Sequence, residues 1–169
     1  MPEAITNTSP LLYLHRIGTV NWLRELFSTI VVPSAVVREL QGGRERGYDV
    51  PDPADHAWLQ IAVPAAVPSE WLALDLGPGE LAVLALGLED RRRIVLLDDG
   101  LARRIAQAAR LQVWGTLTVL LESKRRGLTD AIAPHLRRLE VAGMWISGSL
   151  RERVLALADE SAGERGTES

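Results

Sequence analysis

Residues 94–100 read Ile-Val-Leu-Leu-Asp-Asp-Gly, and this stretch decides the fold class. Its four apolar residues follow one another without alternation, which is typical of a strand that is buried on both faces. Such strands occur in mostly parallel sheets with helices on both sides. Two aspartates and a glycine come next, so the strand ends in acidic side chains just before a predicted helix.

Short apolar runs of this kind recur along the chain, each bounded by Pro, Gly, Asp or Asn. The predicted strands are residues 4–5, 30–32, 61–63, 94–97 and 112–114. Segments with helical spacing are residues 10–17, 20–26, 33–41, 79–88, 101–109, 116–126, 131–141 and 150–158. Two connections rich in glycine and proline are predicted to be mobile loops, residues 41–53 and 64–78. The alternation predicts an α/β fold, a three-layer α/β/α sandwich with a central, mostly parallel sheet and extra C-terminal helices.

The length and composition indicate one domain. The chain has 169 residues, of which 47% are hydrophobic, enough to bury a single core. We predict a single domain over residues 1–159, with a core at about 4–127 and a C-terminal helical extension at 128–159. Residues 160–169 are expected to form a disordered tail, because no apolar residue follows Ala162.

Charge and residue usage exclude several classes of protein. The formal charge of −3 gives no global basic field, so a nucleic-acid partner would have to be held locally. The chain has no cysteine, which excludes disulfides and thiolate metal sites. No apolar run approaches the roughly 18 residues that a membrane span needs. We therefore expect a cytoplasmic protein without a membrane partner.

Polar residues follow the predicted strands at the sheet edge where ligands bind in open α/β folds. They are Asn7, Thr8 and Ser9 after the first strand, Glu39 beyond the second, Asp98 and Asp99 after the fourth, and Glu80 in the first turn of a helix. Each also has a structural interpretation. One member of the first group and one aspartate can cap a helix, and the helix dipole favours a glutamate in a first turn.

The two glutamates border apolar stripes rather than solvent faces. Glu39 lies three residues after Val36, and Glu80 lies three before Val83, so both carboxylates are expected to point toward the body of the protein. Several converging carboxylates repel one another unless a cation lies between them. With no cysteine and with the three histidines on separate segments, an all-oxygen site favours Mg²⁺ or Mn²⁺ over zinc.

Five sequence blocks carry a family resemblance that spans roughly residues 4–127. They are Asn7-Thr8-Ser9-Pro10-Leu11-Leu12, Val32-Pro33-Ser34-Ala35-Val36-Val37-Arg38-Glu39-Leu40, Gly77-Pro78-Gly79-Glu80-Leu81-Ala82, Leu96-Leu97-Asp98-Asp99 and Gly115-Thr116-Leu117. In their order and spacing the chain resembles the PIN-domain family, and more closely the bacterial branch related to VapC-type toxins.

This resemblance implies a metal-dependent ribonuclease that hydrolyses RNA phosphodiester bonds, as the toxin component of a toxin–antitoxin pair. Glu39 and Glu80 correspond to two family acids, and Asp98 or Asp99 to a third. Glu39, Glu80 and Asp98 would ligate Mg²⁺ or Mn²⁺, with Asp99 as an outer-sphere partner or an aid to the attacking water. Asn7 stands where most catalytic members carry Asp. An amide oxygen still binds a cation but adds no charge, so weak metal binding is expected.

Further residues are candidates for substrate contacts. Thr8, Ser9 and Thr116 could place hydroxyls near the metal or the scissile phosphate, or could instead cap helices and bond within the core. Arg103 or Arg104, about one helical turn after Asp99, is the candidate to contact phosphate.

The expected partners are RNA, an antitoxin protein that inserts a segment over the acidic pocket, and a second copy of the chain. The homo-oligomer would use the C-terminal helices. Their apolar positions Leu150, Val154 and Leu157 form either a dimer face or core contacts.

Two alternatives stay open. A non-catalytic PIN-like module would bind RNA or protein, with Asn7 marking the loss of the metal site; Asp at position 7 would then create metal binding. A receiver-like regulatory domain would use Asp98 and Asp99 as a phosphoacceptor pocket. That fold lacks its expected lysine after a later strand, because the one lysine of the chain, Lys124, lies within a predicted helix.

Overall fold

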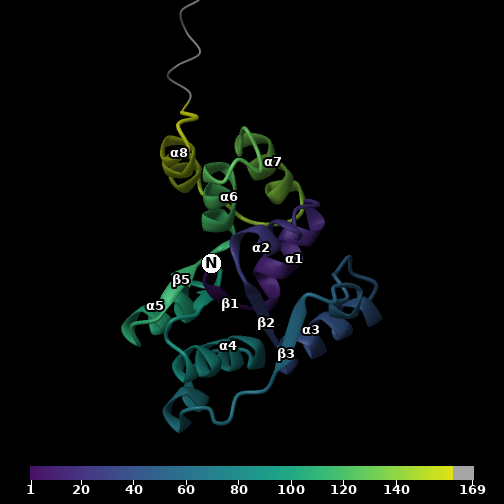
Figure 1. Ribbon diagram of the computed structural model, residues 1–169, viewed down its shortest axis with the longest axis vertical. Helices are drawn as coiled ribbons and strands as arrows, with labels where there is room; N and C mark the ends of the chain where they lie inside the picture. Colours follow the sequence, from purple (N-terminus) through teal and green to yellow (C-terminus); the bar gives the residue numbers. More distant parts are fainter. Residues whose placement is uncertain (162–169) are drawn as a thin grey trace, which may run out of the picture. The chain divides into compact units, whose positions relative to one another are not determined.

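A computed structural model describes residues 1–161 of the chain (Figure 1). The strands in this range are β1 (Glu3–Thr6), β2 (Thr29–Pro33), β3 (Leu59–Ala62), β4 (Ile94–Leu96) and β5 (Gln112–Trp114). The α-helices are α1 (Thr8–Arg16), α2 (Trp22–Leu26), α3 (Ser34–Glu45), α4 (Pro78–Glu89), α5 (Gly100–Ala108), α6 (Thr116–Arg125), α7 (Ala133–Val141) and α8 (Gly148–Leu157). Two short 3₁₀ helices are η1 (Pro53–Asp55) and η2 (Ser69–Ala73). Among these residues, none of the helices has the length and apolar character to cross a membrane.

The five strands form one sheet in the order β3-β2-β1-β4-β5, and every pair is parallel. The chain builds outward from β1 through β2 to β3, then crosses back and continues with β4 and β5. The strand order therefore reverses between β1 and β4, and an open parallel sheet binds its ligands beyond the carboxyl ends of the strands at such a point. Asn7 follows β1 and Asp98 follows β4 closely, so both lie at this reversal.

Both faces of the sheet are buried, which makes it the middle of three layers. Ile5, Val31 and Val95 lie side by side in register and share one face. They belong to an apolar cluster with Val83, Leu84 and Leu86 of α4 and Ala102 and Ala106 of α5. The adjacent row points to the other face and is buried too, at Ala4, Ile30 and Ile94. The predicted α/β sandwich with a parallel sheet and extra C-terminal helices is confirmed.

Several helix boundaries differ from the sequence prediction by one to four residues, and two of these differences have a clear physical reason. Helix α1 begins at Thr8 rather than Pro10, because a proline is tolerated within the first turn, where its missing N–H has no helical partner. Helix α3 continues to Glu45 through the two glycines that predicted a turn. Gly43 is buried, and a Cβ there would lie 3.2 Å from Cγ1 of Val50, so close packing explains this glycine.

The loop predicted at residues 64–78 is partly attached to the core. It contains η2, and its side chains Trp71 and Leu76 pack against the apolar cluster that lines the sheet. Leu72 is 67% exposed between them, so the attachment alternates along the loop. The packing of Trp71 and Leu76 therefore fixes the position of the residues that directly precede α4.

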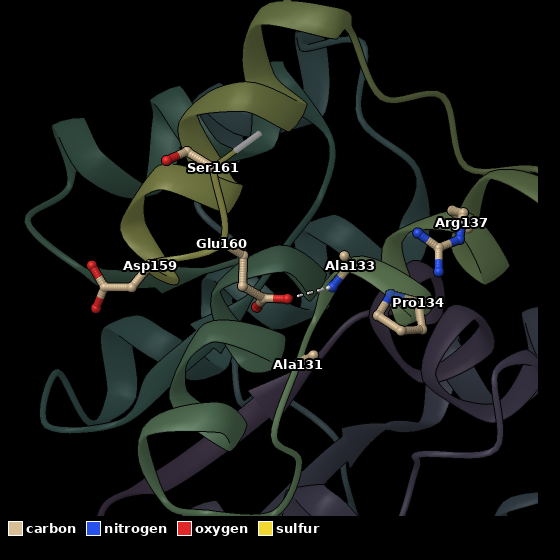
Figure 2. A pocket seen from close by; sticks show the side chains of 7 residues that line it. All are labelled: Ala131, Ala133, Pro134, Arg137, Asp159, Glu160 and Ser161. Atoms are coloured by element: carbon tan, nitrogen blue, oxygen red, sulfur yellow. Dashed lines mark hydrogen bonds between the residues drawn. The ribbon is translucent and has the colours of Figure 1, made fainter. Parts of the chain in front are cut away.

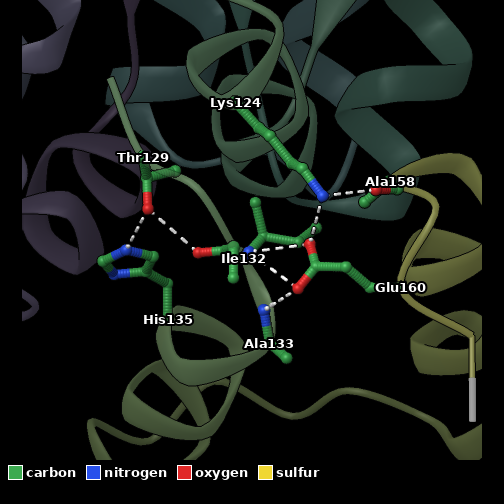
Figure 3. Close-up of polar contacts among 8 residues, drawn as sticks. Lys124, Thr129, Ile132, Ala133, His135, Ala158 and Glu160 are labelled. Carbon is green, nitrogen blue, oxygen red and sulfur yellow. Dashed lines mark hydrogen bonds and ion pairs between the residues drawn. The ribbon is translucent and has the colours of Figure 1, made fainter. Parts of the chain in front are cut away.

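The chain divides into two compact units, Met1–Thr116 and a second unit that begins at Leu117. In the second unit, Figure 3 shows Glu160 accepting hydrogen bonds from the backbone N–H groups of Ile132 (2.8 Å) and Ala133 (3.2 Å) at the start of α7. Its carboxylate also pairs with Lys124 Nζ at 3.0 Å, and Lys124 donates to the carbonyl oxygen of Ala158. Glu160 thus ties the end of α8 to α6 and α7, although the sequence placed it in the tail. The remainder of that tail, residues 162–169, lies outside the described residues.

Candidate active site

Asn7 directly follows β1. Its backbone N–H donates to the carbonyl oxygen of Leu96 on β4 (3.1 Å), which fixes it against the neighbouring strand. It is the N-cap residue of α1, but its side chain makes no capping hydrogen bond. The side chain is 5% exposed, and its buried Oδ1 has no hydrogen-bond partner. An unsatisfied buried acceptor costs roughly 1–3 kcal/mol, so this oxygen is suited to an external donor or a cation.

Glu39 extends from α3 toward the first turns of α1 and α4. Its Oε2 accepts a hydrogen bond from the Thr8 hydroxyl, and its Oε1 accepts one from the backbone N–H of Gly79 (2.9 Å). A Cβ at Gly79 would lie 2.7 and 2.8 Å from the two Glu39 oxygens and 2.9 Å from Asn7 Oδ1. The amide of Asn7 and the carboxylate of Glu39 therefore meet over the backbone of Gly79, where a Cβ would require these oxygens to move.

Glu80 opens α4 beside this pair. Its Oε2 accepts a hydrogen bond from the backbone N–H of Gly77 (2.5 Å), completing a capping arrangement. Burial raises the pKa of the Glu80 carboxyl; the Gly77 hydrogen bond opposes this, and the negative charges of Asp99, Glu39 and Asp75 add to the rise. Glu80 thus lies within the electrostatic reach of three other carboxylates.

Asp75 is an acid that the sequence analysis missed. It lies in the loop before α4, and its charge acts on Glu80. The sequence contains one signal for it: Asp75 lies two residues before Gly77, whose N–H donates to Glu80. The loop conformation that brings it near the acids is not readable from hydrophobic periodicity.

Asp98 and Asp99 follow β4 but have different surroundings. Asp98 accepts hydrogen bonds from the backbone N–H of Thr116 (2.8 Å), the Thr116 hydroxyl (2.7 Å) and the Ser9 hydroxyl (2.9 Å). Asp99 caps α5, because its Oδ1 accepts from the N–H of Ala102 (2.9 Å). Asp99 therefore caps α5 through one of its oxygens, whereas Asp98 bonds to Ser9 and Thr116 within the first unit.

The predicted substrate residues fall into two groups. The hydroxyls of Thr8, Ser9 and Thr116 all donate to acidic side chains, so they orient the carboxylates. Arg103 donates from Nη1 to the carbonyl oxygen of Leu97 (2.9 Å) and holds the end of β4. The exposed Arg104 folds back over the start of α5, with its Nη1 3.5 Å from where a Cβ of Gly100 would lie.

The predicted site residues thus form two groups, which the hydroxyls of Thr8 and Ser9 in the first turn of α1 connect. Asn7, Glu39 and Glu80 meet at the start of α4, and Asp98 lies with Ser9 and Thr116. Within residues 1–161, no three acidic, histidine or cysteine side chains lie close enough to form a ready metal cluster. A divalent cation would therefore need the Asn7 oxygen, water or a ligand oxygen to complete its shell.

The second unit contains a cavity of about 450 Å³ (Figure 2). It is lined by Ala131, Ala133, Pro134, Arg137, Asp159, Glu160 and Ser161. Figure 2 shows the Glu160 carboxylate turned toward the N–H of Ala133, so this acid is already neutralised by protein donors. None of the predicted site residues lines this cavity, and the acidic groups of the first unit remain the candidate site.

A family model described as a PIN domain matches residues 3–160, nearly the whole chain. The chain belongs to the PIN-domain family. PIN domains are commonly nucleases and typically use divalent metal ions, so membership suggests nuclease activity in general. A comparison with curated proteins finds no match. The match covers both compact units of this PIN domain.

Proposed function

We propose that this PIN domain is a ribonuclease that hydrolyses RNA phosphodiester bonds with Mg²⁺ or Mn²⁺. The observation that carries the proposal is the buried, unpartnered Oδ1 of Asn7, which meets Glu39 at the point where the strand order reverses. Glu80 lies close enough for the charge of Glu39 to raise its pKa. Orphaned and anionic oxygens gathered at one place suit a hard cation.

The residues present fit such a cation. Glu39 and Glu80 would hold it directly or through water, with Asn7 as a neutral oxygen ligand, whereas Asp98, which lies in the other acidic group, would reach it through water. All four offer oxygen donors, and the two histidines of the first unit, His15 and His56, have their own neighbours in Asp49 and Trp58. An oxygen-only set of this kind favours Mg²⁺ or Mn²⁺ over zinc.

When bound, the cation would lower the pKa of a water molecule and stabilise the charge that develops on the phosphate. Ser9 and Thr116 fix both oxygens of Asp98, and Thr8 with Gly79 fixes both oxygens of Glu39. The second oxygen of Asp99 would accept the proton of the attacking water. The water oxygen would bond to phosphorus while the bond from phosphorus to the leaving sugar oxygen breaks, and the leaving oxygen would take up a proton from solvent water. Arg104 would contact a phosphate oxygen.

We also propose the biological setting that the sequence resemblance implies. In it the enzyme is the cytoplasmic toxin of a toxin–antitoxin pair, and an antitoxin protein covers the acidic site. A homo-oligomer through the C-terminal helices would offer Leu157, which is 57% exposed on α8, as an apolar contact. The VapC-like branch and the antitoxin rest on the sequence blocks alone, and the homo-oligomer rests on the apolar positions of the C-terminal helices.

The test is RNA cleavage by the purified protein with Mg²⁺, Mn²⁺ or EDTA, on single-stranded and structured RNA. Cleavage is expected only with metal, and Glu39→Gln or Asp98→Asn should slow it by about 100-fold or more while the fold is kept. Glu45→Gln is the matched control, because it makes the same change on the exposed end of α3. Cleavage that persists in EDTA, or that Glu39→Gln leaves intact, would contradict the proposal.

A second candidate is a non-catalytic module that binds RNA or protein. It is favoured by the missing charge of Asn7 and by the absence of a three-acid cluster from the described part of the chain. Under this alternative the wild type cleaves nothing, whereas Asn7→Asp gains metal binding and cleavage. The same assay therefore separates the two functions.

A further inference from the structure

Asn7 contributes a buried oxygen that is unpartnered and neutral, so the protein supplies little negative charge at this point of the candidate site. We propose that RNA and the divalent cation bind this site together, because a phosphate oxygen supplies the anionic ligand that Asn7 does not. The inference rests on the proposed function and concerns the regulation of that same site. The protein would hold little metal until RNA arrives.

The protein oxygens of the site are already occupied in part. Both oxygens of Glu39 and both oxygens of Asp98 accept hydrogen bonds, and one oxygen of Glu80 does so. Each donated hydrogen bond disperses charge that a cation would otherwise meet. The buried oxygen that accepts nothing is Oδ1 of Asn7, and it is neutral.

Phosphate is the ligand that completes such a site. Proteins usually bind Mg²⁺ through one or two carboxylates together with waters and substrate phosphates, rather than through an all-protein cage. A phosphate diester brings the formal charge that Asp would have brought at position 7. The exposed guanidinium of Arg104 at the start of α5 offers a second contact for the same backbone.

Such coupling must be reciprocal. If RNA tightens cation binding, the cation tightens RNA binding by the same factor, and coupling between ligands typically amounts to about 5- to 150-fold. Asn7→Asp should tighten cation binding without RNA and reduce the coupling factor, because the missing charge is then permanent. Asn21→Asp is the matched control: Asn21 is the other asparagine of the sequence and lies exposed at the start of α2.

The experiment is a titration of the full chain with Mn²⁺, followed by electron paramagnetic resonance, with and without a single-stranded RNA. Phosphorothioate linkages slow cleavage of this RNA, and gel analysis checks that it stays intact. The same oligonucleotide with methylphosphonate linkages carries no backbone charge and should give no coupling. RNA affinity with and without Mn²⁺, from fluorescence anisotropy, gives the reciprocal factor.

The expected result is a Kd for Mn²⁺ that falls about 5- to 150-fold with the charged RNA in wild type and Asn21→Asp, and falls less in Asn7→Asp. An equal Kd with and without RNA in the wild type would overturn the inference and leave the metal site of the proposed function standing. A coupling factor in Asn7→Asp that equals the wild-type factor would likewise overturn the inference and leave the metal site standing. Absence of Mn²⁺ binding from the wild type under both conditions would overturn the inference and the proposed metal chemistry together.

Discussion

Glu80 is the acidic residue whose protonation the fold alters most clearly within the candidate site. Its carboxyl is held in a partly buried place by the N–H of Gly77, while Asp99, Glu39 and Asp75 oppose its charge. The folded protein therefore holds the Glu80 proton more tightly than the unfolded chain does. Ionised Glu80 costs stability, and a bound cation would offset that cost.

This predicts a pH dependence of the metal-free protein. Since the folded pKa of Glu80 is raised above 4.5, the folded state binds more protons, and its contribution to stability is lost as pH rises from about 4.5 through the raised value. Glu80→Gln keeps an acceptor for Gly77 and should remove this decline, so the variant is more stable than wild type at pH 7 without metal. Urea unfolding across pH measures the effect, and Glu70→Gln, an exposed glutamate, is the control. A decline of equal size in Glu80→Gln would contradict the assignment.

The positions of the candidate site residues could be predicted from the sequence, but their individual hydrogen-bond partners could not. Asn7, Glu39, Glu80 and Asp98 could be proposed because each follows a strand or borders an apolar stripe. Periodicity could not separate the cap Asp99 from the hydroxyl-bound Asp98, since they are adjacent and chemically identical. Their difference arises from Ser9 and Thr116, which only the tertiary fold brings together.

At the scale of elements, α4 carries the most constrained packing of the site. Gly79 lies in its first turn, under the oxygens of Glu39 and Asn7. Helix propensity alone predicts that Gly→Ala stabilises a helix by up to about 1 kcal/mol. At this position the new methyl group would displace two polar side chains, so packing and propensity act in opposite directions.

We therefore predict that Gly79→Ala destabilises the protein, by roughly 1–3 kcal/mol, and weakens Mn²⁺ binding. Gly148→Ala is the control, because Gly148 opens α8 and a Cβ there meets nothing within 4 Å. Gly148→Ala should be neutral or stabilising. Thermal unfolding of both variants shows whether helix propensity or the crowding of the new methyl group determines stability at Gly79. A Gly79→Ala protein that is as stable as Gly148→Ala would show that the oxygens can move away freely.

Elements were predictable where local preference and tertiary packing agree. The run at residues 94–97 predicted β4 because its apolar residues serve both faces of the sheet. Strand β3 was expected at 61–63 but spans Leu59–Ala62, and it lies at the edge of the sheet with Ile61 60% exposed, so its apolar residues do not mark a strand that is buried on both faces. Helix α3 extends to Glu45, four residues beyond its predicted end at residue 41, because the burial of Gly43 against Val50 outweighs the turn preference of glycine.

At the scale of the whole molecule, the site depends on topology. Its residues lie between Asn7 and Thr116, a span of more than half of the sequence, and a parallel sheet brings the segments that follow its strands to one edge. That rule made the candidate site predictable without coordinates. The approach of the loop containing Asp75 was not predictable, because its fixed points, Trp71 and Leu76, depend on distant core residues.

The second compact unit has its own stabilising contact, and it yields the last prediction. Glu160 accepts from Ile132 and Ala133 at the start of α7 and pairs with Lys124. Burial opposes its ionisation, but these hydrogen bonds and the lysine charge outweigh burial and lower the pKa of Glu160. A lowered folded pKa means that this stability is present above about pH 4.5 and is lost as pH falls through the folded value.

Glu160→Ala should therefore raise the amide exchange rates of Ile132 and Ala133, because their N–H groups lose an acceptor worth roughly 1–3 kcal/mol. The exposed Glu152 on α8 provides the control Glu152→Ala, which should leave these rates unchanged. Hydrogen exchange followed by mass spectrometry or NMR measures both, and acidification of the wild type toward pH 4 should lower the protection factors of the same two amides in part, once the slower intrinsic exchange at low pH is corrected for. Unchanged exchange in Glu160→Ala would mean that water replaces the carboxylate without loss, and that helix packing alone holds the end of α8.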